Sequence, residues 1–204
     1  MKIVVRAEDN LWQEIICCNK AIDWCRISNV TELQEHKDAE AYFNLYPYNK
    51  SDKYPVIDIP VFINSVDIPL SEINDSKHLI RINGWAGFVK RDSWEISGQL
   101  TNNAKLILQH MNKKFIQVND EPGFISARIL AMIINEAFFA REENVSTELE
   151  IDIAMRLGTN YPKGPFEWVK EIGTENIYSL LQKLSDSQPR YKPSPLLMKS
   201  ISAI

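Results

Sequence analysis

The sequence predicts an α/β domain followed by an all-helical domain. Up to about residue 118, short strand-like runs alternate with helical segments, an order typical of a mostly parallel sheet that is covered on both faces. After residue 121 the apolar side chains follow helical spacing only. We therefore expect the two domains at residues 1–118 and 119–204.

In the first domain the expected strands are short and apolar, and polar segments connect them. Strands are expected at residues 3–5, 22–27, 41–45, 60–63, 79–82, 93–96 and 114–118. Helices are expected at residues 10–16, with Asp9 or Asn10 as the cap, at 31–38 and at 102–111.

In the second domain a long helix is expected at residues 122–143, with apolar side chains on nearly every side. A helix that is apolar on every side requires all of its sides to be buried, and a domain of this size is too small to bury them all. We therefore expect residues 122–143 to form a homodimer contact.

The remaining helices of this domain are predicted from their end signals. Thr147 and Glu150 have the spacing of a capping box, and that helix is expected to end at Gly158. Pro165 suits a first helical turn. Gly173 and Thr174 have the pattern of a C-cap followed by an N-cap, and the tail at 195–204 can form a last short helix.

The composition is that of an ordinary soluble chain. It has 204 residues, 45% apolar residues and a net charge of −4, which gives no support for binding of nucleic acid. Its apolar runs are shorter than the ~18 residues of a membrane span, and the start leaves too little room for a signal peptide. The three cysteines have neither disulfide nor metal-site spacing, so we expect a cytoplasmic protein without a metal.

Several motifs in the last third of the chain keep a characteristic order and spacing. They are Asp120-Glu121-Pro122-Gly123-Phe124, Arg128, Asn135-Glu136-Ala137, Asp152-x-x-Met155-x-x-Gly158, Tyr161-Pro162-Lys163-Gly164-Pro165-Phe166-Glu167 and Arg190-Tyr191-Lys192-Pro193-Ser194-Pro195-Leu196-Leu197. This set resembles the C-terminal domain of the 3-hydroxyacyl-CoA dehydrogenases. The resemblance implies a helical domain that helps to form an acyl-CoA cleft and makes the dimer. Glycine and proline in these motifs favour turns between helices, so we expect their role to be structural.

A thinner resemblance to the same family extends the match to residues 60–197. Asn64-Ser65-Val66-Asp67-Ile68-Pro69-Leu70-Ser71-Glu72-Ile73 resembles the family's Asn-Thr-Ser-Ser-Leu-Pro-Ile-Thr-Glu-Ile, while Arg81-x-x-Gly84 and Glu95-Ile96 resemble two further family segments. It implies that residues 1–118 are a shortened, degenerate Rossmann-like domain. Asn64 and Ser65 become candidate substrate-binding residues.

The sequence departs from the family where a dinucleotide would bind. A dinucleotide-binding turn needs glycines after the first strand, so that backbone N–H groups reach the diphosphate. Here the strand continues into Arg6-Ala7-Glu8-Asp9-Asn10, and the first glycine of the chain is Gly84. Glu8 and Asp9 place negative charge where the diphosphate would lie. We therefore expect no cofactor; NAD is implied by the family resemblance alone.

The catalytic positions implied by the resemblance are also altered. The family uses a His as general base, a Glu that orients it, and a Ser and an Asn that bind substrate. These positions correspond to Ala86, Glu95, Val66 and Ala127. Alanine and valine side chains cannot transfer a proton. Glu95 therefore remains as a relic catalytic residue, and whether the chain is an enzyme stays open.

Three hypotheses remain for the function. In the first, the chain is a dimeric binding or assembly protein that has lost NAD binding and catalysis and keeps a relic acyl-CoA cleft. In the second, it is an active or altered 3-hydroxyacyl-CoA dehydrogenase with a relocated site, in which His78 is the base and Glu95 orients it. In the third, it docks onto a full-length paralogue and modulates it.

Two further groups of residues have alternative interpretations. Cys17 and Cys18 could form a redox pair, although packing of the first helix is the simpler role. The large aromatic residues could line an acyl pocket, although core packing accounts for them equally; these are Trp85, Trp94, Trp168, Tyr46 and Tyr48. The other histidines, His36 and His110, have the character of surface residues.

Overall fold

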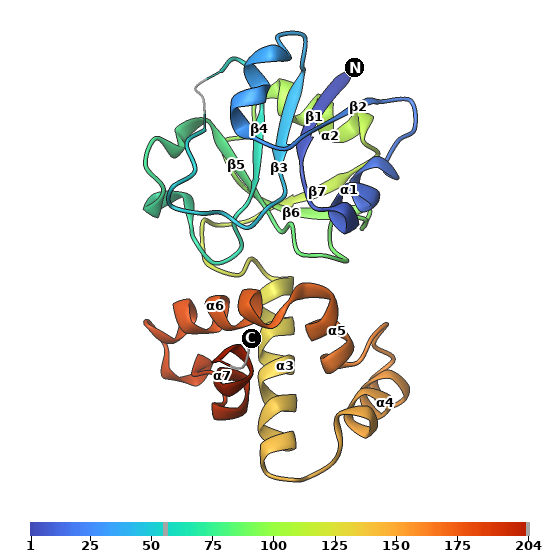
Figure 1. The fold of residues 1–204 in the computed structure, drawn as a ribbon, viewed down its shortest axis with the longest axis vertical. Coiled ribbons are helices and arrows are strands. Elements are labelled where there is room, and N and C mark those ends of the chain that lie inside the picture. Colours follow the sequence, from blue (N-terminus) through green and yellow to red (C-terminus); the bar gives the residue numbers. More distant parts are fainter. Residues whose placement is uncertain (55–56, 203–204) are drawn as a thin grey trace. The chain divides into compact units, whose positions relative to one another are not determined.

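The structure is a computed structural model that describes residues 1–54 and 57–202. The chain divides into two compact units, Met1–Phe124 and Ile125–Ile204. The first unit is an α/β fold and the second is all-helical (Figure 1). The predicted fold class is therefore confirmed.

A seven-stranded sheet with the order β2-β1-β3-β4-β5-β6-β7 forms the centre of the first unit. The strands β2, β1, β3, β4 and β5 are parallel to one another. Strand β6 pairs antiparallel with β5 and parallel with β7. The direction reverses at β6 because residues 83–92 are too few for a crossover connection. The strands are β1 (Lys2–Arg6), β2 (Asp23–Ile27), β3 (Ala41–Asn44), β4 (Val61–Asn64), β5 (Leu79–Ile82), β6 (Ser93–Gly98) and β7 (Lys114–Gln117).

Two helices, α1 (Asp9–Ile16) and α2 (Asn102–His110), cover one face of the sheet. Their apolar sides pack on alternate strand residues, and the rings of Phe43 and Phe62 stack with centroids 4.3 Å apart in this layer. The structure corrects the expected cap of α1. Glu8, in extended conformation, occupies the N-cap position without a side-chain capping bond.

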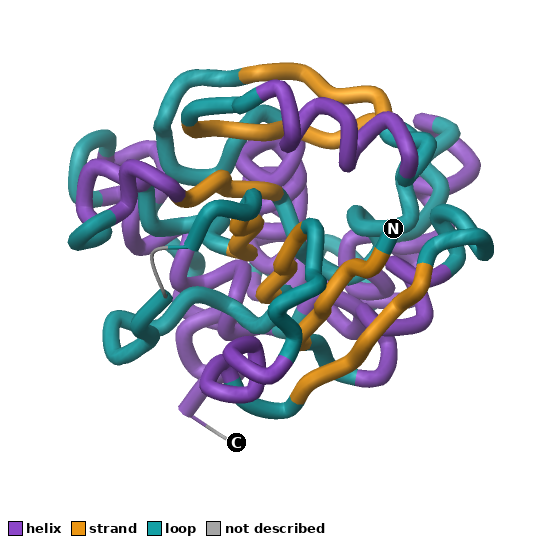
Figure 2. The backbone as a smooth tube through the Cα atoms, turned by 90° about the horizontal axis from the view of Figure 1, so that it is seen from above, coloured by secondary structure: helices purple, strands orange, loops and turns teal. Residues whose placement is uncertain are grey.

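The second face of the sheet is covered by loops and short 3₁₀ helices. Figure 2 shows the strands in orange and the connecting segments in teal. Among residues 1–54 and 57–124 this face carries η1 (Val30–Glu35), η2 (Leu70–Glu72) and η3 (Ser76–His78), but no α-helix. The helix predicted at residues 31–38 is thus a shorter 3₁₀ helix. Asn29 and Glu32 form a capping box at its start, as polar residues near a helix end commonly do.

The second unit consists of helices packed around α3. They are α3 (Ser126–Glu142), α4 (Glu148–Thr159), α5 (Pro165–Ile172), α6 (Thr174–Ser185), η4 (Pro189–Tyr191) and α7 (Pro195–Ser202). Helix α3 contacts α4, α5, α6 and α7. It has a buried side and an exposed side, so its apolar residues are not all covered within one copy of the chain.

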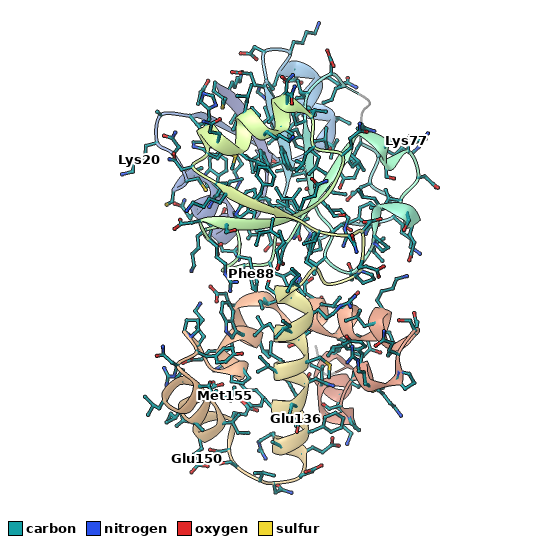
Figure 3. All side chains as sticks on the ribbon, turned by 180° about the vertical axis from the view of Figure 1, so that it is seen from behind. Lys20, Lys77, Phe88, Glu136, Glu150 and Met155 are labelled. Atoms are coloured by element: carbon teal, nitrogen blue, oxygen red, sulfur yellow. The ribbon has the colours of Figure 1, made fainter. Side chains whose placement is uncertain are left out.

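Some predicted helix ends of this unit are confirmed and others are wrong. The Thr147–Glu150 capping box forms at the start of α4 (Figure 3 labels Glu150), and Pro165 begins α5. Helix α4 continues through Gly158 to Thr159. Asn160 is its C-cap, since asparagine tolerates the left-handed conformation that it adopts there (φ 54°). Thr174 is the first residue of α6 rather than its cap.

The long helix also begins later than predicted, at Ser126 instead of residue 122. Gly123 and Phe124 have φ values of 85° and 50°, which are incompatible with a right-handed helix. The N–H of Gly123 instead donates to the carbonyl of Val66 at 2.7 Å. The last two residues of the predicted C-terminal helix, 203–204, lie outside the described residues. No helix in the described ranges has the length and apolar character needed to cross a bilayer.

Candidate functional site

Asn64 lies at the carboxyl end of β4 and joins the ends of three neighbouring strands. Its Nδ2 donates to the carbonyl of Leu45 at 2.9 Å, and its Oδ1 accepts from the N–H of Gly84 at 3.2 Å. A Cβ atom on Gly84 would lie 2.5 Å from the Asn64 Cγ, so only glycine fits there. Both polar ends of the buried Asn64 side chain are therefore used within the fold.

Ser65, the second predicted substrate-binding residue, is fully buried. Its hydroxyl donates to the carbonyl of Ile68 at 2.6 Å. Its own carbonyl accepts from Nε of Arg81 at 2.8 Å. The structure thus places Ser65 in a tight loop that a buried arginine stabilises.

Asp120 completes this buried network. It accepts the N–H groups of Leu70 and Ser71 at 2.9 Å each and pairs with Nη1 of Arg81. Burial by itself would raise the pKa of Asp120, but these N–H donors and the guanidinium outweigh burial and hold the pKa below its usual value. Asp120 and Arg81 are therefore a structural ion pair at the end of the sheet unit.

Ala86 lies in the turn that follows β5, at the position that the resemblance assigns to the general base. Its methyl group is buried in the same apolar cluster as Trp94 and Ile96. The neighbouring N–H of Gly87 is already bound, because Glu14 of α1 accepts it at 2.7 Å. Neither the side chain nor this amide is free to act on a substrate.

Glu95 and His78 do not come together. Ile82 pairs with Ile96, and the same antiparallel register puts Glu95 beside residue 83. His78 lies five positions further back, at the end of η3, so that the whole of β5 separates it from residue 83. Glu95 also points away from the cluster around Ala86, since its neighbours Trp94 and Ile96 face that cluster. Within the described residues, the buried Nε2 of His78 has no hydrogen-bond partner.

The turn between β1 and α1 is held by an arginine from β2. Arg26 donates from Nε and Nη2 to the carbonyl of Ala7, at 3.1 and 2.7 Å, and its Nη1 lies 2.6 Å from Oδ1 of Asp9. Glu8 and Asp9 add two carboxylates at the N-terminus of α1. A second anion at this helix end would meet like charge.

A polar cavity of about 490 Å³ lies beyond the carboxyl ends of β1, β2 and β3. In open α/β sheets such a place, where crossovers leave a strand in opposite directions, is where ligands bind. Here Arg6, which lines the cavity, donates to the carbonyl of Ser28 at 3.1 Å and to Oδ1 of Asn44 at 3.4 Å. Its guanidinium also lies 4.5 Å from the ring centre of Tyr46. The cation is thus largely engaged in the fold.

The aromatic side chains considered for an acyl pocket pack in the interior of the two units. Trp85, Trp94 and Trp168 are buried, and Nε1 of Trp94 donates to the carbonyl of Val89 at 3.0 Å. Tyr48 stacks on Tyr54 with centroids 6.5 Å apart. Core packing therefore accounts for these rings.

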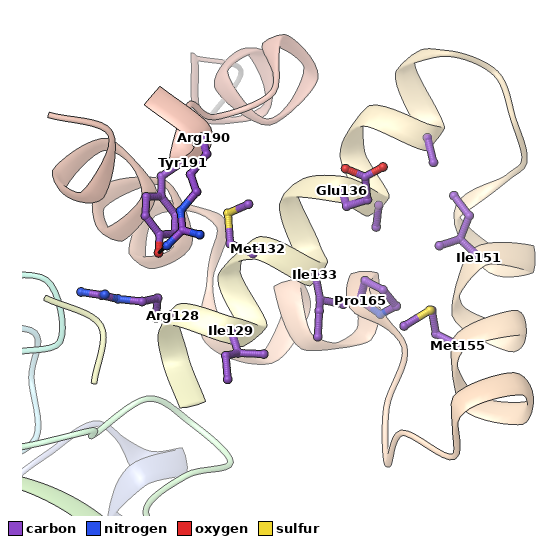
Figure 4. Close-up of a pocket in the computed structure, with 12 residues that line it drawn as sticks. Arg128, Ile129, Met132, Ile133, Glu136, Ile151, Met155, Pro165, Arg190 and Tyr191 are labelled. Atoms are coloured by element: carbon purple, nitrogen blue, oxygen red, sulfur yellow. Dashed lines mark hydrogen bonds between the residues drawn. The ribbon is translucent and has the colours of Figure 1, made fainter. Parts of the chain in front are cut away.

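The helical unit carries an apolar cavity of about 740 Å³ along α3 (Figure 4). Its floor comes from α3, α4 and the start of α5, and charged side chains lie at its rim. The apolar lining consists of Ile129, Met132, Ile133, Ala137, Ala140, Ile151, Met155 and Pro165, and the polar lining of Arg128, Glu136, Arg190 and Tyr191.

The glycine and asparagine motifs of this unit build helix junctions. Asp152 of α4 accepts the N–H of Phe166 at 2.8 Å and so caps α5, while a Cβ atom on Gly164 would lie 2.3 Å from Oδ1 of Asp152. Asn135 of α3 binds the segment before α7. Its Nδ2 donates to the carbonyl of Lys192 at 3.0 Å, and its Oδ1 accepts the N–H of Ser194 at 2.8 Å. These contacts support a structural role for the motifs.

Comparison with known proteins identifies the family. Residues 123–203 match the 3-hydroxyacyl-CoA dehydrogenase, C-terminal domain. Residues 123–203, which make up nearly all of the helical unit, therefore form a 3-hydroxyacyl-CoA dehydrogenase C-terminal domain. The 3-hydroxyadipyl-CoA dehydrogenase of Escherichia coli is 43% identical over 99 residues, which are 48% of this chain and 21% of that protein. The probable 3-hydroxybutyryl-CoA dehydrogenase of Bacillus subtilis is 37% identical over 99 residues, 48% of this chain and 34% of that protein.

The 3-hydroxyacyl-CoA dehydrogenase fold extends over both units. The crystal structure of (S)-3-hydroxybutyryl-CoA dehydrogenase from Ralstonia eutropha is similar to 99% of this chain and 93% of its own, with a TM-score of 0.71 and 16% identity. At that identity the likeness shows the fold alone. The aligned stretches span well under half of the two curated relatives named above, so the activity of a whole relative does not pass directly to this chain.

The four family positions fall into different parts of the 3-hydroxyacyl-CoA dehydrogenase fold of this chain. Val66, Ala86 and Glu95 belong to the sheet unit, and Ala127 is buried in α3. Sequence reasoning missed Glu14 and Arg26, which bind the turns where the family's chemistry would be placed. No local pattern marks them, because their partners lie far along the chain. In the described ranges no three His, Cys, Asp or Glu side chains gather as a metal site.

Proposed function

We propose that this chain is a non-catalytic member of the 3-hydroxyacyl-CoA dehydrogenase family and acts as a dimeric binding or assembly protein. The observation that carries the proposal is the environment of Ala86. A methyl group packs into the core where the resemblance requires a general base, and Glu14 holds the adjacent N–H. Proton abstraction from a substrate hydroxyl needs a base within hydrogen-bond reach, and no such group is at this position.

Loss of NAD binding is the second part of the proposal. The residues of the β1–α1 turn do not fit a dinucleotide diphosphate, since the turn holds Glu8 and Asp9 and lacks glycine. Arg26 binds the Ala7 carbonyl within the same turn. A diphosphate is best bound by free N–H groups at a helix N-terminus without a competing carboxylate.

Dimerisation through the helical unit is supported by its exposed apolar surface. Ile129 is 55% exposed, and Leu149 and Leu157 on α4 are 67% and 82% exposed. Large apolar side chains that remain exposed on one unit support an interaction surface there. Arg128 and Glu136 lie eight residues apart at the rim of the same cavity. In a two-fold symmetric pair of antiparallel α3 helices, each arginine would face the partner's carboxylate.

The oligomeric state tests this part. Sedimentation velocity at micromolar concentration should show a dimer, and Ile129→Lys should give a folded monomer because it places a charge in the interface. The matched control is Ile116→Lys on β7 of the sheet unit, where the isoleucine is 52% exposed. A monomeric wild-type protein would contradict the proposed homodimer. A monomer that co-purifies with a full-length family member from its native cell would favour the heteromeric role.

Ligand binding and turnover test the loss of chemistry. Thermal shift against NAD, NADP, CoA and acetoacetyl-CoA should show no response to either nucleotide, whereas a ligand at 100-fold excess over its Kd would add about 2.7 kcal/mol. A response to CoA or acetoacetyl-CoA alone would support a relic acyl-CoA cleft. NADH formation from 3-hydroxybutyryl-CoA that is abolished in His78→Ala would overturn the proposal in favour of a relocated active site.

A further inference from the structure

A cysteine and a histidine lie in contact on the edge strand of the sheet. Sγ of Cys25 in β2 is 3.5 Å from Nε2 and 3.8 Å from Nδ1 of His36. Both side chains are partly exposed. A thiol within hydrogen-bond distance of an imidazole is the arrangement that activates a cysteine nucleophile.

The local fold explains why these two residues meet. Alternation along β2 places Cys25 on the face that carries η1, next to Ile27 and the cluster around Leu33. The capping box of Asn29 starts η1 immediately after β2, so that this short helix passes back over the strand. Helix η1 ends at Glu35, and the following C-cap residue is His36, whose backbone N–H donates to the carbonyl of Leu33 at 3.1 Å. His36 is thereby fixed above the strand.

The charged groups around the pair come from the neighbouring strand and the loop after His36. Lys2 of β1 is paired in register with Asp23, and its ammonium lies 2.9 Å from the carboxylate of Asp38. The bond to Asp38 is the main cause that raises the pKa of Lys2, and the charges of Cys25 and Asp23 add to it. The Cys25–His36 pair therefore has one ammonium group and two carboxylates in its surroundings.

The other two cysteines lack this arrangement. Cys17 is exposed at the end of α1. Cys18 is partly buried, its Sγ lies 3.8 Å from the carbonyl of Glu14, and burial raises the pKa of its thiol. Among the described residues neither thiol has a histidine as a hydrogen-bond partner. Cys17 and Cys18 therefore serve as controls for the effect of His36 on the reactivity of a thiol in the same protein.

We propose that Cys25 is a nucleophilic thiol with His36 as its base, and that it forms mixed disulfides reversibly with small-molecule disulfides. His36 takes the proton from Sγ, and the thiolate attacks one sulfur of the disulfide. The Cys25–S–S–R bond forms as the S–S bond of the reagent breaks. The departing thiolate takes the proton from His36 and leaves as a thiol. The Cys25 sulfur is oxidised and the released sulfur is reduced, so the disulfide is the only oxidant required.

Single-thiol variants test the proposal with 5,5′-dithiobis(2-nitrobenzoate) as the disulfide. The pair Cys17→Ser/Cys18→Ser leaves Cys25 alone, and the pair Cys18→Ser/Cys25→Ser leaves the exposed Cys17 as the matched control. An unassisted thiol is only a few per cent thiolate at pH 7, so Cys25 should react ~10-fold faster than Cys17 there. His36→Gln in the Cys25-only protein should remove that advantage. Mass spectrometry should place the adduct on Cys25.

A pH profile provides a second readout that needs no change at His36. Between pH 8 and pH 6 the rate of the Cys25-only protein should decrease less steeply than that of the Cys17-only protein, because His36 lies in contact with the Cys25 thiol and can accept its proton. Reaction of Cys25 at or below the Cys17 rate would overturn the proposal. So would equal rates for the Cys25-only protein with and without the His36→Gln substitution, or profiles of the same slope for the two thiols.

Discussion

Arg81 and Asp120 form an ion pair in which Nη1 lies 2.5 Å from Oδ1, and the arginine side chain has no exposed surface. Arg81 also donates to the carbonyls of Ser65, Val66 and Glu121. The pair therefore connects β5, the loop after β4 and the segment that follows β7. A buried guanidinium without its carboxylate is costly, because the charge remains desolvated.

Asp120→Asn should destabilise the sheet unit by about 2 kcal/mol or more, since the amide keeps the backbone bonds in part but leaves Arg81 without a counter-charge. Urea unfolding followed by circular dichroism measures the change. Asp58→Asn is the control, because Asp58 is exposed and such substitutions usually change stability by less than about 0.5 kcal/mol. An equal decrease in the free energy of unfolding in the two variants would contradict a structural role for the Arg81–Asp120 pair.

The same carboxylate predicts a pH dependence. The folded-state pKa of Asp120 is lowered despite burial, by the N–H groups of Leu70 and Ser71 and by Arg81. A group with a depressed folded pKa stabilises the fold above its unfolded pKa of about 4, and that contribution is lost as the pH falls through the lower folded value. The urea midpoint of the wild type should drop more steeply below pH 4 than that of Asp120→Asn. An equal fall of the urea midpoint with pH in the two proteins would contradict this contribution of Asp120.

Two glycines of the helical unit should respond in opposite directions to alanine. Gly164→Ala should destabilise, because the new Cβ would lie 2.3 Å from the Asp152 carboxylate that caps α5. Gly158→Ala should stabilise by up to about 1 kcal/mol, since Gly158 is helical and has open space around its Cα. Thermal unfolding followed by circular dichroism at the helix band measures both changes. A Gly164→Ala protein as stable as wild type would show that Asp152 can move aside.

Asn135→Ala should loosen the segment before α7. The change removes the side-chain bonds to the partly buried carbonyl of Lys192 and to the buried N–H of Ser194. A buried N–H group without a partner costs about 1–3 kcal/mol. Amide hydrogen exchange should show faster exchange at residue 194 and in α7. Asn102→Ala, at the exposed start of α2, is the control and should leave this region unchanged. Unaltered exchange in both variants would contradict the assignment.

Much of the fold was predictable because its signals are local. The seven strands follow from short apolar runs, and the Thr147–Glu150 box and Pro165 mark helix starts within one turn. The misplaced ends have local causes too. Asn160 and Phe124 adopt left-handed conformations that an apolar pattern does not reveal. The predicted helix at residues 31–38 is the six-residue 3₁₀ helix η1, a distinction that the polar pattern of this segment does not reveal.

The candidate sites were less predictable. Asn64 and Ser65 were named as binding residues from the resemblance, and the structure uses their polar atoms for contacts with Leu45, Gly84 and Ile68. Helical periodicity predicted an apolar α3, but whether its exposed side is covered depends on how α4 and α5 pack against it.

The sequence by itself determined the two-part architecture and the family of the helical domain, because strand and helix periodicities and turn residues act between neighbours in the chain. Only the tertiary structure decided what occupies the places where chemistry would occur. Arg26 reaches the β1–α1 turn, Glu14 holds the turn after β5, and His36 meets Cys25. Each of these contacts joins residues that the chain brings together only when the sheet forms, so no spacing in the sequence encodes it.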